Sequence, residues 1–156
     1  MRTLLTKAIL ALAITSVAAF GADNSIGTWK LNVEKSKYTP APMPVKSLTI
    51  TREASDGGAK VTTTGERTDG PINASYTAKY DGTEVKVTGS NLTYDTIAIK
   101  QVNANTLTDE RRKVVGPYKA TGRTVVSNGG KMMTTTTKGT NADGKQFTST
   151  LVFDKQ

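Results

Sequence analysis

Short runs in which apolar and polar residues alternate, separated by turn-forming residues about every 8 to 12 positions, dominate this sequence. The clearest run covers residues 72–80, where every second residue from Ile72 to Tyr80 is apolar, so these side chains would share one face of a strand. Asp-Gly pairs at positions 69–70 and 81–82 bracket this run and suit tight reversals. The pattern predicts an all-β protein with about eight to ten antiparallel strands.

The connections between the predicted strands are short, so strands that are neighbours in the sequence become neighbours in the sheet. An open meander of this kind exposes two edges that can aggregate, whereas closure into an up-and-down β-barrel removes both edges. A sandwich, the alternative, needs crossovers that few of these connections can make, so we predict the barrel. Residues 32–44 are the exception, because Pro40, Pro42 and Pro44 lack N–H donors. We predict a long loop there, lying across one mouth of the barrel.

The N-terminus has the features of a cleavable signal peptide. Arg2 and Lys7 flank the start of an apolar stretch, residues 8–19, that is shorter than the roughly 20 residues of a membrane-spanning helix. Small residues follow and predict cleavage near residues 19–22; an uncleaved anchor is the alternative. We therefore expect a protein exported to the periplasm or secreted, with residues 1–22 removed. Residues 23–156 would form one soluble domain without an integral membrane segment, and no cysteine follows for lipid attachment.

The composition excludes several chemistries. The chain contains no histidine and no cysteine, which removes the commonest general base, thiol catalysis, disulfides and most transition-metal ligands. We predict no catalytic residues, no metal site, no cofactor and no enzymatic activity. Without Arg2 and Lys7 the formal charge falls from +8 to +6. The remaining lysines are scattered rather than clustered, which indicates a solvated surface and no nucleic-acid partner. We expect a monomer.

The apolar faces of the strands predict the lining of the barrel interior. Several inward positions hold small residues, such as Ala78 and Ala120, so the interior is either a cavity of ligand size or a packed core, and the sequence leaves both alternatives open. The candidate lining residues are Tyr76, Tyr80, Tyr94, Ile97, Ile99, Tyr118 and Phe147.

A charged run at residues 108–113 (TDERRK) offers a polar site. Strand alternation places Arg112 on one face and Arg111 on the other. We take Arg112, together with Arg123 of the following strand, as the candidate arginines of the interior, where a guanidinium could bind an anionic group with two hydrogen bonds. The alternative is a solvated edge strand whose charges prevent the addition of another strand.

Gly27-Thr28-Trp29 at the start of the first strand, and the aliphatic-aromatic-acid-Lys ending in residues 151–156, resemble the two ends of calycins, the superfamily of lipocalins and fatty-acid-binding proteins. The resemblance implies a barrel closed by pairing of its last strand with its first. Gly27, Trp29, Phe153 and Lys155 would then form a structural seam, with a cationic side chain on the Trp29 indole.

The resemblance also implies a small apolar or amphiphilic ligand. Residues 150–153 lack the Arg-x-Tyr with which fatty-acid-binding proteins hold a carboxylate, and the helices of that branch are absent. The start GTWKLN…KSKY is similar to that of exported lipocalin-like bacterial proteins of uncharacterised function. Two functions follow: a small-molecule binding protein with a cavity, or an interaction module, such as an inhibitor or envelope-associated factor, with a filled barrel.

Overall fold

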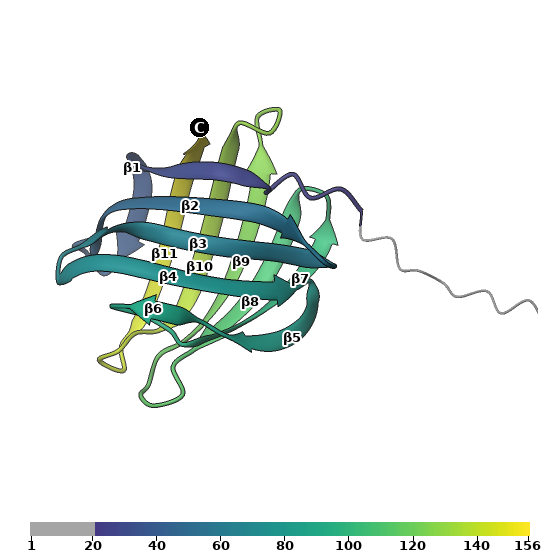
Figure 1. The fold of residues 1–156 in the computed structure, drawn as a ribbon. Helices are drawn as coiled ribbons and strands as arrows, with labels where there is room; N and C mark the ends of the chain where they lie inside the picture. The colour runs from purple at the N-terminus through teal and green to yellow at the C-terminus, as the bar shows by residue number, and fades with distance from the viewer. Residues whose placement is uncertain (1–20) are drawn as a thin grey trace, which may run out of the picture.

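The computed structural model describes residues 21–156, so nearly all of the predicted signal peptide lies outside the described residues. The described residues form eleven β-strands and no helix, and hence no helix long and apolar enough to cross a membrane (Figure 1). The strands are β1 (Gly27–Thr39), β2 (Val45–Ser55), β3 (Gly58–Arg67), β4 (Gly70–Lys79), β5 (Asp81–Lys86), β6 (Thr88–Ser90), β7 (Thr96–Asn103), β8 (Thr106–Arg112), β9 (Lys119–Ser127), β10 (Met132–Thr140) and β11 (Gln146–Lys155).

All eleven strands belong to one antiparallel sheet with the order β5-β7-β8-β9-β10-β11-β1-β2-β3-β4-β6. Consecutive strands pair with each other from β1 to β4 and from β7 to β11, and β1 also pairs with β11. In Figure 1, β1 to β4 cross in front of β8 to β11, and the sheet curves into a nearly closed barrel. The predicted antiparallel meander barrel is therefore confirmed.

The seam between β1 and β11 contains the only tryptophan of the chain. Trp29 is opposite Lys155 and Leu31 is opposite Phe153, and the Trp29 and Phe153 side chains are fully buried. The indole Nε1 donates a hydrogen bond to the Ser25 carbonyl at 2.8 Å, and the Lys155 ammonium lies 5.1 Å from the indole ring. The seam thus combines backbone pairing, apolar burial and a cation–π contact at the closed end of the barrel.

Gly27 makes room for Lys155 at this seam. A Cβ at position 27 would lie 2.8 Å from Lys155 Cε, and the Gly27 φ of +133° is one that residues with a side chain rarely adopt. Glycine therefore allows both the backbone conformation and the stacking of Lys155 on Trp29.

The prediction of a loop over residues 32–44 is wrong for most of its length, because β1 continues to Thr39. A bulge between Asn32 and Lys37 interrupts the pairing with β11, after which Tyr38 is opposite Ser149. Side chains satisfy the backbone at the bulge: Ser36 Oγ donates to the Asn32 carbonyl at 2.7 Å and accepts from the backbone N–H of Val152 at 3.0 Å. Only residues 40–44 form the connection to β2.

One extended segment, residues 81–90, closes the remaining side of the barrel between β4 and β7. Its first part, β5, pairs with β7, and its second part, β6, pairs with β4, so the chain changes partner at the buried residue Val87. At the closed end, the Gln101 N–H donates directly to the Tyr80 carbonyl at 3.3 Å. This change of partner divides the segment into two strands, β5 and β6.

Replacing Trp29 with alanine should lower the free energy of unfolding by about 3–5 kcal/mol, because it opens a large cavity at the seam. Val115→Ala is the control, since Val115 is 84% exposed and its loss should change stability by no more than about 0.5 kcal/mol. Urea unfolding followed by far-ultraviolet circular dichroism measures both variants without needing the indole signal. Equal losses in the two variants would mean that the seam does not depend on Trp29.

Candidate ligand-binding cavity

The barrel encloses a cavity of about 360 Å³. Residues of the β1–β2, β6–β7 and β10–β11 connections line it, including Met43, Thr93 and Ala142, so the cavity extends to the end of the barrel where these connections meet. We call this end the mouth. At the opposite end Trp29 and its contacts fill the interior. Of the two alternatives that the sequence left open, the structure therefore has the cavity.

Most of the cavity wall is apolar, and a smaller part carries hydroxyl groups. Two of these hydroxyls, Thr124 Oγ1 and Thr135 Oγ1, are hydrogen-bonded to each other at 2.9 Å. Since they satisfy one another, this part of the wall is less polar than its composition suggests. The apolar residues of the wall include Leu48, Ile50, Val61, Ile97, Ile99, Leu107, Met133, Leu151 and Phe153.

Four aromatic rings form a continuous arc near the mouth. Tyr38 stacks on Phe147 with ring centroids 5.6 Å apart, Phe147 on Tyr118 at 6.0 Å, and Tyr118 on Tyr94 at 6.2 Å. Each residue lies near the mouth end of its strand or just before its strand begins, which brings rings from distant parts of the sequence together. The arc gives one side of the cavity flat, polarisable surfaces on which an apolar group can pack.

Arg111 and Asp109 of β8 form a buried ion pair in the cavity wall. The Arg111 guanidinium donates from Nε to Asp109 Oδ1 at 2.5 Å and from Nη2 to Oδ2 at 3.0 Å, and it lies 5.4 Å from the Tyr94 ring. Burial by itself lowers the pKa of Arg111, but the Asp109 carboxylate outweighs this effect and the pKa lies well above its ordinary value. The Arg111 guanidinium is therefore charged, and the Asp109 carboxylate is its counter-ion.

Gly122 of β9 provides the space for this ion pair. It is opposite Asp109, and a Cβ at position 122 would lie only 2.5 Å from Asp109 Oδ2. The backbone of Gly122 does not have the left-handed conformation that favours glycine. The absence of a side chain, and not conformational freedom, is what this position requires.

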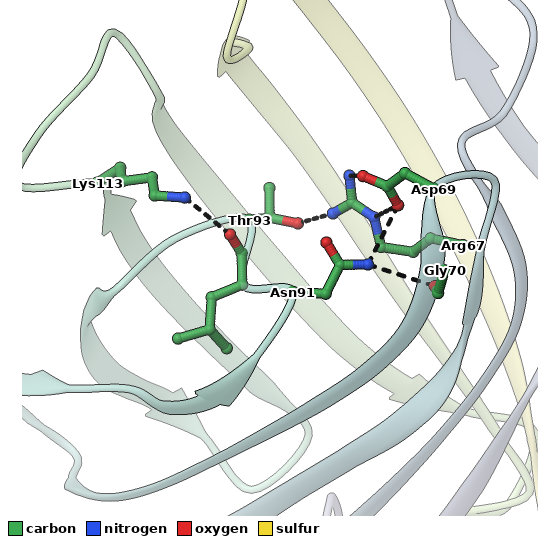
Figure 2. Close-up of polar contacts among 7 residues, drawn as sticks. Arg67, Asp69, Gly70, Asn91, Thr93 and Lys113 are labelled. Carbon is green, nitrogen blue, oxygen red and sulfur yellow. Dashed lines mark hydrogen bonds and ion pairs between the residues drawn. The ribbon is translucent and has the colours of Figure 1, made fainter.

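Arg67 at the end of β3 belongs to a polar cluster on the rim of the mouth (Figure 2). Its Nε lies 3.1 Å from Asp69 Oδ1, its Nη2 also reaches this carboxylate, and its Nη1 donates to the Thr93 hydroxyl. Asn91 donates to Asp69 at 3.2 Å, and Lys113 donates to a backbone carbonyl of the β6–β7 connection at 3.1 Å. The cluster ties three connections of the rim together.

Arg52 of β2 lines the inner part of the cavity, close to the closed end. The residue is only 7% exposed, and its Nη2 donates to the Tyr80 hydroxyl at 3.3 Å. The Tyr80 hydroxyl in turn donates to Asp23 at 2.5 Å. Arg52 Nε is buried without a hydrogen-bond partner among the described residues. Burial lowers the pKa of Arg52, but the neighbouring Tyr76, Tyr80 and Asp23 raise it above its ordinary value, so the side chain is charged.

Three tyrosine hydroxyls at the cavity wall are available to a ligand. The hydroxyls of Tyr76, Tyr94 and Tyr118 make no hydrogen bond within residues 21–156, and all three side chains line the cavity. Burial raises the pKa of each of these phenols, that of Tyr118 to about 12. At neutral pH they are therefore protonated and can donate hydrogen bonds.

The structure places six of the nine predicted interior residues on the cavity wall: Tyr76, Tyr94, Ile97, Ile99, Tyr118 and Phe147. Tyr80 is buried but does not line the cavity; its hydroxyl accepts a hydrogen bond from Arg52 and donates one to Asp23. Arg112 and Arg123 lie on the outer surface. Arg112 forms an exposed pair with Glu84, with Nη2 and Oε1 2.6 Å apart. The choice of these two arginines for the interior is therefore corrected, because β8 turns Asp109 and Arg111 inward.

Strand alternation was the signal that could have identified the interior arginines. Leu48 and Ile50 share a face with Arg52, because each is two positions from the next. In the same way, Leu107 shares its face with Asp109 and Arg111. An arginine that continues an apolar face is expected to lie inside, as Arg52 and Arg111 do.

Comparison with known proteins supports the fold alone. No protein-family model matches this chain, and no curated protein does either. A crystal structure of a protein of unknown function from the DUF3598 family of Nostoc punctiforme is similar, with a TM-score of 0.53 and 13% sequence identity. The alignment covers 85% of this chain and 47% of that one, so the present chain spans about half of its length.

The described residues contain no group of three or more acidic, histidine or cysteine side chains that could hold a metal ion. Of the carboxylates that line the cavity, Asp109 is paired with Arg111, and Asp143 lies in the exposed β10–β11 turn. The chemistry of the wall is therefore that of apolar surface, phenol hydroxyls and arginine.

Replacing Gly122 with alanine should lower the free energy of unfolding by about 1–3 kcal/mol, because the new methyl group displaces the Asp109 carboxylate from Arg111. Elsewhere in a strand the same change usually stabilises by about 0.5–1 kcal/mol, so the sign tests the close approach. In an Asp109→Ala background the methyl group has space, and the additional effect of Gly122→Ala should become small. Equal effects in both backgrounds, measured by urea unfolding, would contradict this account.

The tyrosines should make the fold sensitive to alkaline pH. All five have a pKa above the ordinary value of about 10, with burial the main cause, so the folded state holds the phenol protons more tightly than the unfolded state. Their contribution to stability is complete below about pH 10 and is lost as the pH rises toward the folded-state pKa values. Near-ultraviolet absorbance should show most phenols ionising together with unfolding. Ionisation of all five near pH 10 in a folded chain would contradict the burial.

Proposed function

We propose that this protein binds a small apolar or amphiphilic molecule inside its barrel, in the manner of a lipocalin-like carrier. The cavity is the observation that supports this proposal. Its volume of about 360 Å³ lies within the roughly 300–1,000 Å³ typical of ligand sites, and its wall is mainly apolar with a few polar groups. A cavity of this size replaces side-chain packing that would stabilise the barrel, which favours a functional reason for it.

The aromatic arc and the free phenols are consistent with such a ligand. Tyr118 and Tyr94 offer ring faces for an apolar body and hydroxyls for a polar substituent. The bound molecule would be mainly apolar, because most of the wall is apolar and two of its polar pairs, Asp109–Arg111 and Thr124–Thr135, are bonded internally.

An interaction module, the alternative, would have a filled barrel and would use the predicted loop at residues 32–44 as its contact surface. The cavity argues against a filled barrel. Because β1 continues to Thr39, only residues 40–44 remain as a loop for such a contact surface. The proposed carrier acts outside the cytoplasm after removal of residues 1–22 and has no catalytic turnover. It binds its ligand as a monomer.

A cavity-filling variant tests the proposal. N-phenyl-1-naphthylamine, a neutral fluorescent probe, should bind the wild-type protein with an increase in fluorescence. Ser149→Phe should weaken this binding at least about tenfold, because Ser149 is a small, buried residue of the cavity wall and the new ring occupies the ligand space. Near-ultraviolet circular dichroism checks that the variant is folded.

Thr148→Phe is the matched control. Thr148 is adjacent on β11 but exposed on the outer face, so its new ring leaves the cavity unchanged and probe affinity should stay at the wild-type value. Native mass spectrometry of protein purified from its own compartment should show a bound small molecule. A clean apo mass, together with no probe binding by the folded wild-type protein, would rule out the carrier function.

A further inference from the structure

Three arginines line the cavity, and two of them are paired with carboxylates. Arg111 is held by both oxygens of Asp109, and Arg67 by both oxygens of Asp69. Arg52 differs, because no carboxylate contacts its guanidinium in residues 21–156. The remaining residues, 1–20, contain no Asp or Glu that could supply one.

The hydrogen-bonding capacity of Arg52 is largely unused. A guanidinium has five N–H groups, and in the described chain only one bond is made, from Nη2 to the Tyr80 hydroxyl at 3.3 Å. The nearest acid of this network, Asp23, is separated from Arg52 by Tyr80 and also accepts from the Ser25 N–H and hydroxyl, at 2.8 and 2.6 Å. A charge that is 93% removed from solvent without a direct counter-ion is costly unless something pairs with it.

We propose that Arg52 is the anion-binding group of the cavity, and that the ligand is an amphiphile with one carboxylate, sulfonate or phosphate group directed toward the closed end. This inference rests on the proposed carrier function and specifies the chemical class and the orientation of the ligand. The free Tyr76 hydroxyl, on β4 of the same part of the wall, is placed to donate a further hydrogen bond to the anion. Arg111 and Arg67 do not compete for it, since their own carboxylates already occupy them.

The orientation follows from where the two kinds of surface lie. Arg52 is near the closed end, whereas the rings of Tyr38, Phe147, Tyr118 and Tyr94 lie toward the mouth. A ligand with its anionic group on Arg52 therefore places its apolar body along the middle of the cavity and against the aromatic arc. Apolar side chains around Arg52, including Ile50 and Val61, exclude water from the ion pair and strengthen it.

A matched pair of fluorescent probes tests the inference. Anilinonaphthalene sulfonate has the aromatic body of N-phenyl-1-naphthylamine with an added sulfonate. Arg52→Met should reduce the affinity for the anionic probe roughly 10- to 100-fold, as expected for the loss of charge-assisted hydrogen bonds, and should leave the affinity for the neutral probe within about twofold. Arg123→Met removes the same charge from the outer surface and should leave both affinities unchanged.

The possible outcomes separate the two proposals. If the folded wild-type protein binds neither probe, the carrier function fails. If it binds both, and Arg52→Met weakens both equally or weakens neither, the carrier function stands and the anion site is refuted. Near-ultraviolet circular dichroism distinguishes cavity binding from binding of the anionic probe to a loosened fold.

Arg52→Lys keeps the inference testable if the methionine variant does not fold. Lysine retains the positive charge but lacks the planar fork, so this variant should show a smaller loss for the anionic probe and none for the neutral probe. An Arg52→Lys variant that binds the anionic probe as tightly as wild type does, while Arg52→Met is unfolded, would assign Arg52 a structural role instead.

Discussion

The pairing of β1 with β11 is the interaction on which the rest of this structure depends. A meander of this length has two edges whose N–H and C=O groups would otherwise need water or another chain. Joining the two ends turns the sheet into a barrel, and closure separates an inside from an outside. Every later feature, including the cavity, the aromatic arc and the inward arginines, exists only because that separation is made. The buried contacts of Trp29 and Phe153 stabilise the closure, and the bulge in β1 lets it continue to Tyr38.

Three arginine side chains line the cavity, although most of the cavity wall is apolar. Two of the three cavity arginines are compatible with burial because a carboxylate of the same strand or turn meets each guanidinium with two hydrogen bonds. The Asp109 side chain fits because Gly122 on β9, opposite it, has no side chain, so the ion pair depends on both β8 and β9. Arg52 breaks this arrangement. Buried polar groups without a partner occur mainly at functional sites, and Arg52 is such a group.

Alternation predicted the fold well because each strand could be judged from its own residues. It also placed Tyr76, Ile97 and Ile99 inside. It failed for residues 108–113, because charged residues occupy both faces of this run. The preceding residue, Leu107, is apolar and identifies the inward face. The extension of β1 could not be read locally, because residues 32–39 lack apolar alternation and are held by β11, more than a hundred positions away. The cavity could not be predicted either, since its volume depends on side chains of nine strands meeting in space.

The two short strands that meet at Val87 are each paired over fewer residues than the two strands of the seam. Along the seam, backbone hydrogen bonds run through most of β1, whereas β5 is bonded only to β7 and β6 only to β4, over a few residues each. Regions with few such bonds open locally at a lower free energy than the whole molecule unfolds. The amide protons of residues 81–90 should accordingly exchange with solvent before those of β10 and β11. Local opening of this segment would expose the interior from the side while the seam stays intact.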